Sequence, residues 1–303
     1  MKFLFTLILF TNYLFSIDIG TLNIQNEKNI ITQANDIKKL LHLYNIDLNI
    51  KLTNNSLESI DNIINNKTNN YFAIVNKDTI FNYNKKSQEN KSIYSQIPAI
   101  LSLGDEQIHI FTNPQNEFDF DIKKDYKVYC GKYNSNSCVS ARYIQEMYEL
   151  NFTYIKSNLQ TIQDDLNSNK IDLFISVKKA PYKQFESFSN IKLIDLPTNF
   201  KMEDIYVNTQ LKSNIYSFLD NDIHLYSVKQ VLITNLKEKK YKSLINNIVK
   251  IIILNKDYLE KQNKQQWQNI DFYNTKYKKF LKSAKITIQI LQEQKKREDA
   301  LKF

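Results

Sequence analysis

Segments that fit β-strands alternate with segments that fit α-helices along this chain, and the same order occurs twice. Over residues 17–112, and again over 126–197, a strand precedes a helix, a second strand, a second helix and a buried strand. Alternation of this kind is typical of mostly parallel sheets that helices cover on both faces. The 303 residues suffice for two lobes with cores of their own. The sequence therefore predicts an α/β protein with two lobes.

Hydrophobic spacing locates the individual elements. Asn55, with Glu58 three residues later, has the pattern of a capping box at the start of a helix. Strands are expected at 17–24, 46–52, 71–75, 107–112, 126–130, 152–156, 171–177, 191–197 and 228–234. Helices are expected at 34–44, after Asn55, and at 138–150, 159–166, 241–252 and 277–291.

The N-terminus resembles a secretion signal. Residues 1–16, MKFLFTLILFTNYLFS, combine an early lysine, an apolar run and Ser16 as a small residue at the end. Thr11 and Asn12 interrupt the run, which is short for a bilayer span, so a cleaved signal peptide is favoured over a retained anchor. We expect cleavage near Ser16 and a mature chain in the periplasm.

The two halves suggest a division into lobes. We assign residues 17–112 and 226–303 to lobe 1, which then carries the C-terminal helices, and residues 113–225 to lobe 2. The net charge of +9 is concentrated in residues 236–303, which hold 17 Lys or Arg and 7 Asp or Glu. Such a region can bind nucleic acid, anionic lipid or an acidic partner, or it can be a solvated, lysine-rich helical surface. Export argues against nucleic acid.

The segment 126–144, YKVYCGKYNSNSCVSARYI, places a polar loop between a strand and a helix. The first N–H groups of a helix have no acceptor within it, and together with the helix dipole they favour an anion. Ser135 and Ser137 add hydroxyl groups, and Asn134 and Asn136 tolerate the left-handed backbone that such a turn can need. The loop is therefore a candidate anion site; the alternative is that these residues only cap the helix.

The two cysteines, Cys130 and Cys138, bracket this loop. An exported protein can keep a disulfide, which would staple the loop. The alternative is one thiol in the core and one at the start of the helix. Their spacing matches neither a zinc motif nor a redox motif.

Catalytic motifs are not evident in the sequence. His42, His109 and His224 are isolated and lack metal-ligand spacing, and neither a serine elbow nor a phosphate-binding loop occurs. We therefore expect no enzyme, no metal site and no cofactor. An enzyme that uses a two-lobed fold is the rival class.

The polar loop resembles the second-lobe signature of the TAXI family, the solute-binding subunits of TRAP transporters. In CGKYNSNSCVSA, Gly131, Ser135 and Ser137 stand at the positions of a conserved glycine, serine and threonine of that family. Residues 159–189 are similar to its helix, strand and proline segment, with Asp172 and Pro181 at the matching positions. The likeness spans about residues 18–255, although the family's glycine-rich first loop after Thr21 is absent.

The resemblance implies a type II periplasmic binding protein fold, whose two lobes close by a hinge on a small anionic solute, such as a carboxylate, and deliver it to TRAP membrane permease subunits. The implied ligand-binding residues are Asn55, Ser56, Ser135, Asn136, Ser137, Arg142, Pro181 and Tyr182. For Arg142 the alternative is a surface position, and for Tyr182 an ordinary packed aromatic. The alternative function is a degenerate binding protein that serves as a ligand sensor or interaction module for a membrane receptor.

Overall fold

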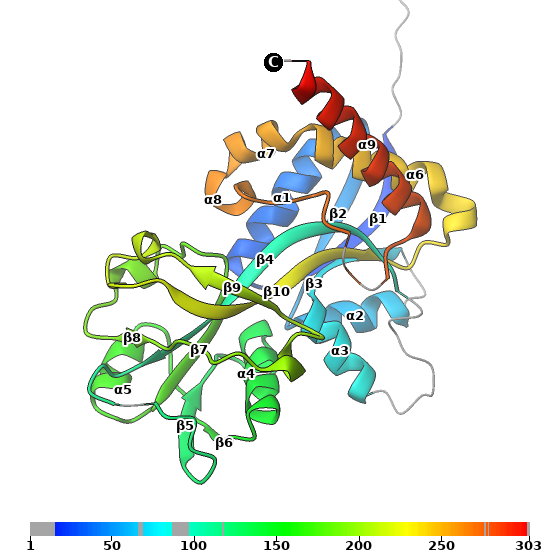
Figure 1. The fold of residues 1–303 in the computed structure, drawn as a ribbon. Helices are drawn as coiled ribbons and strands as arrows, with labels where there is room; N and C mark the ends of the chain where they lie inside the picture. Colours follow the sequence, from blue (N-terminus) through cyan, green and yellow to red (C-terminus); the bar gives the residue numbers. More distant parts are fainter. Residues whose placement is uncertain are drawn as a thin grey trace, which may run out of the picture.

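The structure, a computed structural model, describes residues 16–65, 69–86, 97–116, 118–275, 277 and 279–301. It has two lobes, with the N-terminal strands and the C-terminal helices in the upper one and the middle of the chain in the lower one (Figure 1). The predicted signal peptide lies, apart from Ser16, outside the described residues.

One continuous curled sheet runs through both lobes, with strand order β2-β1-β3-β10-β4-β7-β5-β6. Its strands are β1 (Ile17–Gln25), β2 (Ile46–Thr53), β3 (Asn70–Asn76), β4 (Ala99–Thr112), β5 (Asp125–Tyr129), β6 (Asn151–Tyr154), β7 (Leu173–Lys178), β8 (Lys192–Leu193), β9 (Val207–Leu211) and β10 (Ile223–Thr234). β1, β2 and β3 are parallel to one another, and so are β5, β6 and β7. Each lobe therefore contains a parallel unit, as the alternation of elements predicts.

Two long antiparallel strands, β4 and β10, connect the lobes. β4 pairs with β10 over most of its length, and its last part, Gln107–Phe111, pairs with β7 of lobe 2. β10 pairs first with β9 and then, from Gln230 to Thr234, with β3 of lobe 1. Both strands run diagonally from one lobe to the other in Figure 1. A bend of these two strands can therefore change the angle between the lobes.

Helices cover both faces of the sheet. They are α1 (Lys28–His42), α2 (Ser56–Ile64), α3 (Lys77–Lys86), α4 (Asn136–Met147), α5 (Ile162–Asn167), α6 (Glu238–Leu254), α7 (Lys256–Gln262), α8 (Lys264–Trp267) and α9 (Lys282–Ala300). α1, α6 and α9 share one apolar core on lobe 1, which α8 joins through Trp267. The indole Nε1 of Trp267 donates to Asp36 Oδ2 of α1 at 2.8 Å.

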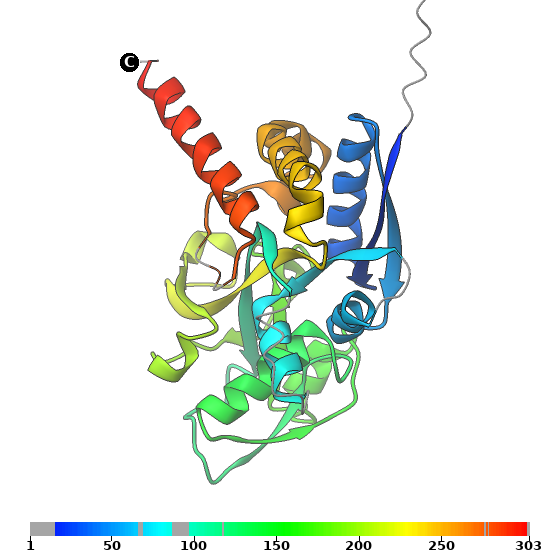
Figure 2. The same cartoon turned by 90° about the vertical axis from the view of Figure 1, so that its right-hand side faces the viewer.

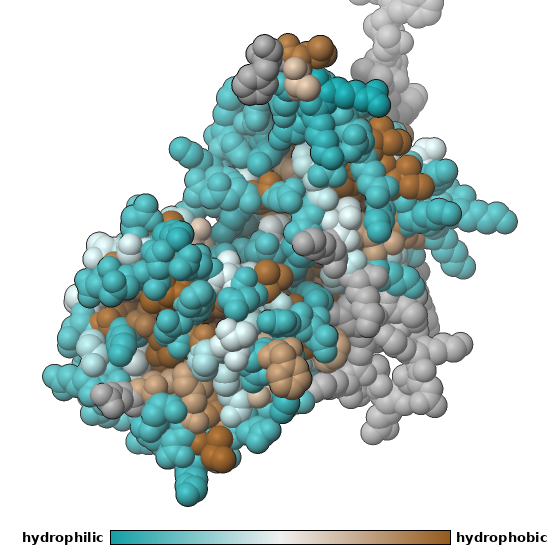
Figure 3. All heavy atoms as spheres, viewed as in Figure 1, coloured by the Kyte–Doolittle hydropathy of each residue, from teal (hydrophilic) through white to brown (hydrophobic). Residues whose placement is uncertain are grey.

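The C-terminal helices lie on lobe 1, and α9 projects outward from it (Figure 2). Mostly hydrophilic residues cover these helices in the view of Figure 3. This surface agrees with the lysine-rich, solvated alternative for the basic region. Among the described residues, none of the helices combines the length and apolar content that a bilayer span requires.

Element boundaries differ from the predicted ones where tertiary pairing decides them. β4 begins at Ala99 rather than at 107, because β10 provides hydrogen-bonding partners from Ala99 onward. The strand predicted at 191–197 shrinks to β8, which pairs only with the end of β4. The polar helix α3 was not predicted, and the helix predicted from 277 begins at Lys282.

Candidate functional site

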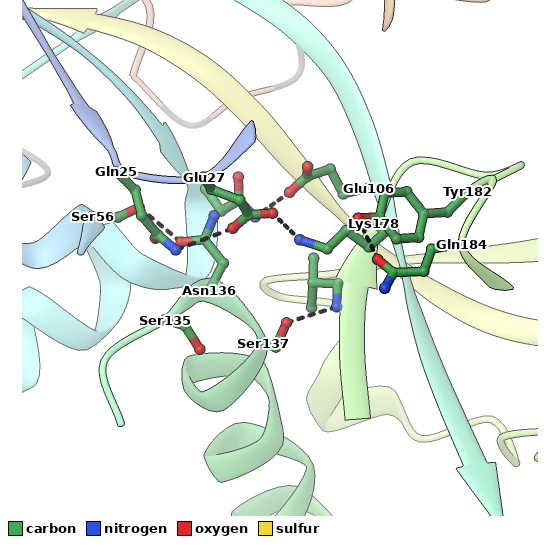
Figure 4. Close-up of polar contacts among 12 residues, drawn as sticks. Gln25, Glu27, Ser56, Glu106, Ser135, Asn136, Ser137, Lys178, Tyr182 and Gln184 are labelled. Carbon is green, nitrogen blue, oxygen red and sulfur yellow. Dashed lines mark hydrogen bonds and ion pairs between the residues drawn. The ribbon is translucent and has the colours of Figure 1, made fainter. Parts of the chain in front are cut away.

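The lobe 1 side of the site is the start of α2. The Asn55 side chain accepts a hydrogen bond from the Glu58 amide at 3.0 Å, and the Glu58 carboxylate accepts one from the Asn54 amide at 2.8 Å. Asn55 thus caps α2 as the sequence predicts, while Glu58 reaches back to Asn54, the residue before the cap, rather than to Asn55 as in a standard capping box. This arrangement leaves Ser56, the first residue of α2, pointing toward lobe 2 (Figure 4).

The lobe 2 side is the start of α4. Ser135 caps this helix: its Oγ accepts from the Cys138 amide at 3.3 Å and donates to the Cys130 carbonyl at 3.1 Å. The Ser137 hydroxyl accepts from the Val177 amide at 2.9 Å and so ties α4 to the end of β7. Ser135 and Ser137 are thus engaged within lobe 2, while Asn136 faces lobe 1 (Figure 4).

Ser56 and Asn136 meet between the lobes. The Ser56 hydroxyl lies 2.8 Å from Asn136 Oδ1 and 3.1 Å from Gln25 Oε1, and all three residues are buried. One hydroxyl proton serves two amide oxygens here, so these acceptors have capacity for a further donor. The starts of two helices from different lobes therefore face each other across one polar contact.

An ion pair lies beside this contact. Lys178, the last residue of β7, donates to the carboxylate of Glu27, which directly precedes α1 (Figure 4). Their side chains are 12% and 22% exposed. Burial lowers the pKa of Lys178 to about 8, because desolvation disfavours the ammonium form. We call Gln25, Glu27, Ser56, Asn136, Ser137 and Lys178 the cleft cluster.

Two buried carboxyl groups lie next to the cleft cluster, near the strands that connect the lobes. Glu106 of β4 accepts a hydrogen bond from the Asn76 amide at 2.8 Å. Asp78 of α3 accepts from the hydroxyls of Ser140 at 2.5 Å and Tyr206 at 3.0 Å. Burial raises the pKa of Glu106 to about 7 and that of Asp78 to about 6. Both groups thus take up protons in the folded state near neutral pH.

Replacing Glu106 with glutamine is expected to change how stability depends on pH. Between the ordinary glutamate pKa of 4.5 and about 7, folded Glu106 keeps a proton that the unfolded chain has lost, so its contribution to stability falls as the pH rises. Glu106→Gln removes this loss. Urea unfolding at pH 5 and pH 7.5 should show the variant gaining roughly 1–3 kcal/mol relative to wild type at the higher pH.

The buried Asp78 carboxyl interacts with Glu106 and raises its pKa, so the two titrate together, whereas the comparison with wild type at each pH cancels the titrating groups that do not interact with Glu106. His109 is the important one, since burial lowers its pKa to about 4 and its contribution changes with pH in the opposite direction. A stability difference between wild type and Glu106→Gln that stays constant from pH 5 to pH 7.5 would contradict the raised pKa of Glu106.

The remaining predicted site residues have other partners. Arg142 donates from Nη1 to the Tyr133 carbonyl at 2.7 Å, and its guanidinium lies over the Tyr133 ring, so both contacts are made within lobe 2. The Pro181 carbonyl accepts from Gln265 at 2.7 Å. Tyr182 comes nearest to the cluster, with the Lys178 ammonium 5.7 Å from its ring centroid. Of these residues, Tyr182 therefore lies near the cleft cluster, and Arg142 does not.

The structure joins Cys130 and Cys138 in a disulfide that closes the polar loop. For a loop of eight residues' separation, the bond is expected to contribute about 2–3 kcal/mol to the free energy of unfolding. Reduction should therefore lower the urea midpoint of the wild type, whereas the Cys130→Ser/Cys138→Ser double variant should not respond to reductant. Two thiols that react with an alkylating agent before reduction would refute the bond.

Gln25, Glu27, Lys178 and Glu106 were not predicted from the sequence. A positional signal existed for the first three: ligands of open α/β sheets bind at the carboxyl ends of parallel strands, and these residues end or follow β1 and β7. β1 continues to Gln25, so the loop into α1 is only Asn26 and Glu27.

A metal centre is not apparent in the part of the chain that the structure describes, because no three His, Cys, Asp or Glu side chains gather there. Hydroxyl, amide and ammonium groups dominate the cleft cluster instead. Such groups bind a polar organic solute through charge-assisted hydrogen bonds.

Comparison with known proteins finds similar folds but no family. No family model matches the chain, and no curated protein matches it. XAC2383 from Xanthomonas citri, solved bound to ATP, is 6% identical with a TM-score of 0.51, covering 92% of this chain and 99% of that one. The CA3427 gene product of Candida albicans, described as exhibiting the generic periplasmic binding protein structural fold, is 12% identical with a TM-score of 0.49, covering 89% of each chain.

A third structure comes from work on glutathione import via GshT and the cystine ABC importer TcyBC of Streptococcus mutans. It is 13% identical with a TM-score of 0.49, covering 83% of this chain and 95% of that one. At such identities a likeness concerns the fold alone. The structure itself confirms the predicted two-lobed α/β fold, with two long strands that cross between the lobes.

Proposed function

We propose that the chain is a solute-binding protein that captures a small anionic metabolite between its lobes by hinge closure. The observation that carries this proposal is Lys178, a largely buried ammonium at the end of β7 that faces lobe 1 beside the start of α4. A solute carboxylate that binds between the lobes would accept hydrogen bonds from Lys178 and from the first N–H groups of α4.

In the structure, the Glu27 carboxylate pairs with the Lys178 ammonium. In the proposed cycle the solute carboxylate displaces Glu27 from Lys178, while Ser56, Gln25 and Asn136 bind its polar remainder. Contacts with both lobes favour the closed form only by the difference in affinity between the two forms. Asn55 and Ser135 act through the backbone by fixing the two helix starts, and Tyr182 borders the site.

The proposed setting is the periplasm, after removal of residues 1–16. Delivery to TRAP-type membrane subunits follows from the resemblance to the TAXI family, and the proposed role requires no catalysis.

Calorimetry on residues 17–303 with succinate, malate and glutamate tests the proposal. Saturable one-to-one binding without turnover, together with a raised unfolding temperature, is the expected result, because a ligand that binds only the folded state stabilises it. If a broad panel of organic acids neither binds nor shifts the unfolding temperature, the solute-binding role fails.

A second candidate, a sensor or interaction module for a membrane receptor, is favoured by one observation. The polar groups of the two lobes already pair with each other, through Ser56 with Asn136 and Glu27 with Lys178. A closed form held by its own side chains needs no solute. If no acid of the panel binds, and the mature chain captures an envelope protein, this candidate would be supported.

A further inference from the structure

Lobe 2 contains a cavity apart from the cleft cluster. It has a volume of about 590 Å³ and lies between the ends of β5 and β6 and the start of α4. The disulfide forms part of its wall, and all its lining residues belong to 128–157. None of them is a member of the cleft cluster. The volume falls within the usual range for small-molecule sites, roughly 300–1,000 Å³.

The charged side chains that line this cavity are all positive. Lys132, Arg142 and Lys156 are among its lining residues, whereas no aspartate or glutamate is. A concave surface with charges of one sign concentrates its field and attracts the opposite charge. The cavity therefore suits an anion.

Arg142 supplies an unused donor at the wall of this cavity. Its Nη1 is bonded to the Tyr133 carbonyl at 2.7 Å, but its Nη2 is buried and has no hydrogen-bond partner among the described residues. A buried guanidinium donor without an acceptor is unfavourable, and a carboxylate or phosphate oxygen would relieve that cost. The neighbouring Tyr133, whose ring lies against this guanidinium, is itself 66% exposed.

Aromatic rings line the same cavity. Tyr129, Tyr133 and Tyr154 contribute to it, and the Arg142 guanidinium lies 4.7 Å from the Tyr133 ring centroid. Large aromatic side chains that stay exposed offer flat apolar surface for stacking. Val128, Ile155 and the disulfide add further apolar wall.

We propose that this cavity is a second binding site, which takes a small aromatic anion. The ring of the ligand lies against Tyr133 and Tyr154, and its carboxylate or phosphate binds Arg142 with help from Lys132 and Lys156. Because one lobe supplies the whole site, binding there does not require closure of the lobes. The inference is independent of the proposed solute in the cleft.

Titration of the ¹⁵N-labelled mature chain with phenyl phosphate and with benzoate tests this site. We expect saturable amide shifts in residues 129–133 and 154–157 for both probes at millimolar concentrations. Inorganic phosphate lacks the ring and benzyl alcohol lacks the charge, so each should bind about tenfold more weakly or not at all. Comparing the two anionic probes tells whether the site prefers carboxylate or phosphate.

Two variants assign the binding to this cavity. Arg142→Gln, which removes the guanidinium charge but keeps a polar side chain, should weaken phenyl phosphate binding about tenfold or more. Lys178→Met, a change in the cleft, should leave it unchanged. The proposal is overturned if the probes shift no amides, if inorganic phosphate binds as well as phenyl phosphate, or if the shifts appear only in the cleft cluster. The amide shifts of the wild type decide the matter even if Arg142→Gln fails to fold.

Discussion

Replacement of Lys178 by methionine is expected to weaken binding of an anionic solute in the cleft by about 100-fold or more. Methionine keeps much of the length of the side chain but removes the ammonium. Loss of one partner of a buried, hydrogen-bonded charge pair costs about 2–5 kcal/mol, and 100-fold corresponds to about 2.7 kcal/mol. The measurement is calorimetry with the tightest-binding acid of the panel.

Glu27→Gln and Lys201→Met complete this experiment. Glu27→Gln frees Lys178 from its internal partner, so the acid should bind at least as tightly as to wild type. Lys201, whose side chain is 47% exposed, pairs with Glu149 away from the cleft, and its replacement should have no effect. If Glu27→Gln weakens binding as much as Lys178→Met does, Glu27 contacts the solute instead of competing with it. Equal affinity of Lys178→Met and wild type would remove Lys178 from the site.

Replacement of Trp267 by alanine is expected to lower the free energy of unfolding by about 3–5 kcal/mol. Trp267 is fully buried in the core of lobe 1, and its indole nitrogen holds the buried carboxyl of Asp36 on α1. The change would leave a cavity and an unpaired Asp36, whose pKa burial already raises. Urea unfolding followed by circular dichroism measures the effect.

Trp267→Phe is the matched control, because it keeps most of the apolar volume and loses only the hydrogen bond. It should cost clearly less than the alanine change. This pair of variants also tests the assignment of the C-terminal helices to lobe 1. A cost below about 1 kcal/mol for Trp267→Ala would mean that the segment carrying α8 does not pack on α1.

Local patterns predicted local structure well. Asn55 caps α2 as predicted, and Ser135 caps α4, because capping depends on residues within three or four positions. The alternation of strands and helices likewise gave the fold class. Strand ends were less certain, since β4 extends along β10, a partner more than a hundred residues away.

The cleft cluster depends on distant pairs, which periodicity does not reveal. Glu27 and Lys178 are 151 positions apart, and Ser56 and Asn136 are 80 apart. A helix-start rule found Ser56 and Asn136, because both begin helices. Lys178 is one of many lysines, and only its place at the end of β7 distinguishes it. Arg142 was predicted to bind the ligand together with these residues, but its side chain lines the cavity of lobe 2.

Hydrogen exchange with and without a saturating acid tests most directly whether two lobes grip one anion. Slower exchange should appear together in residues 25–28 and 54–58 of lobe 1 and in 135–139 and 176–179 of lobe 2. Protection confined to a single lobe, or none in the presence of an acid that demonstrably binds, would contradict capture between the lobes.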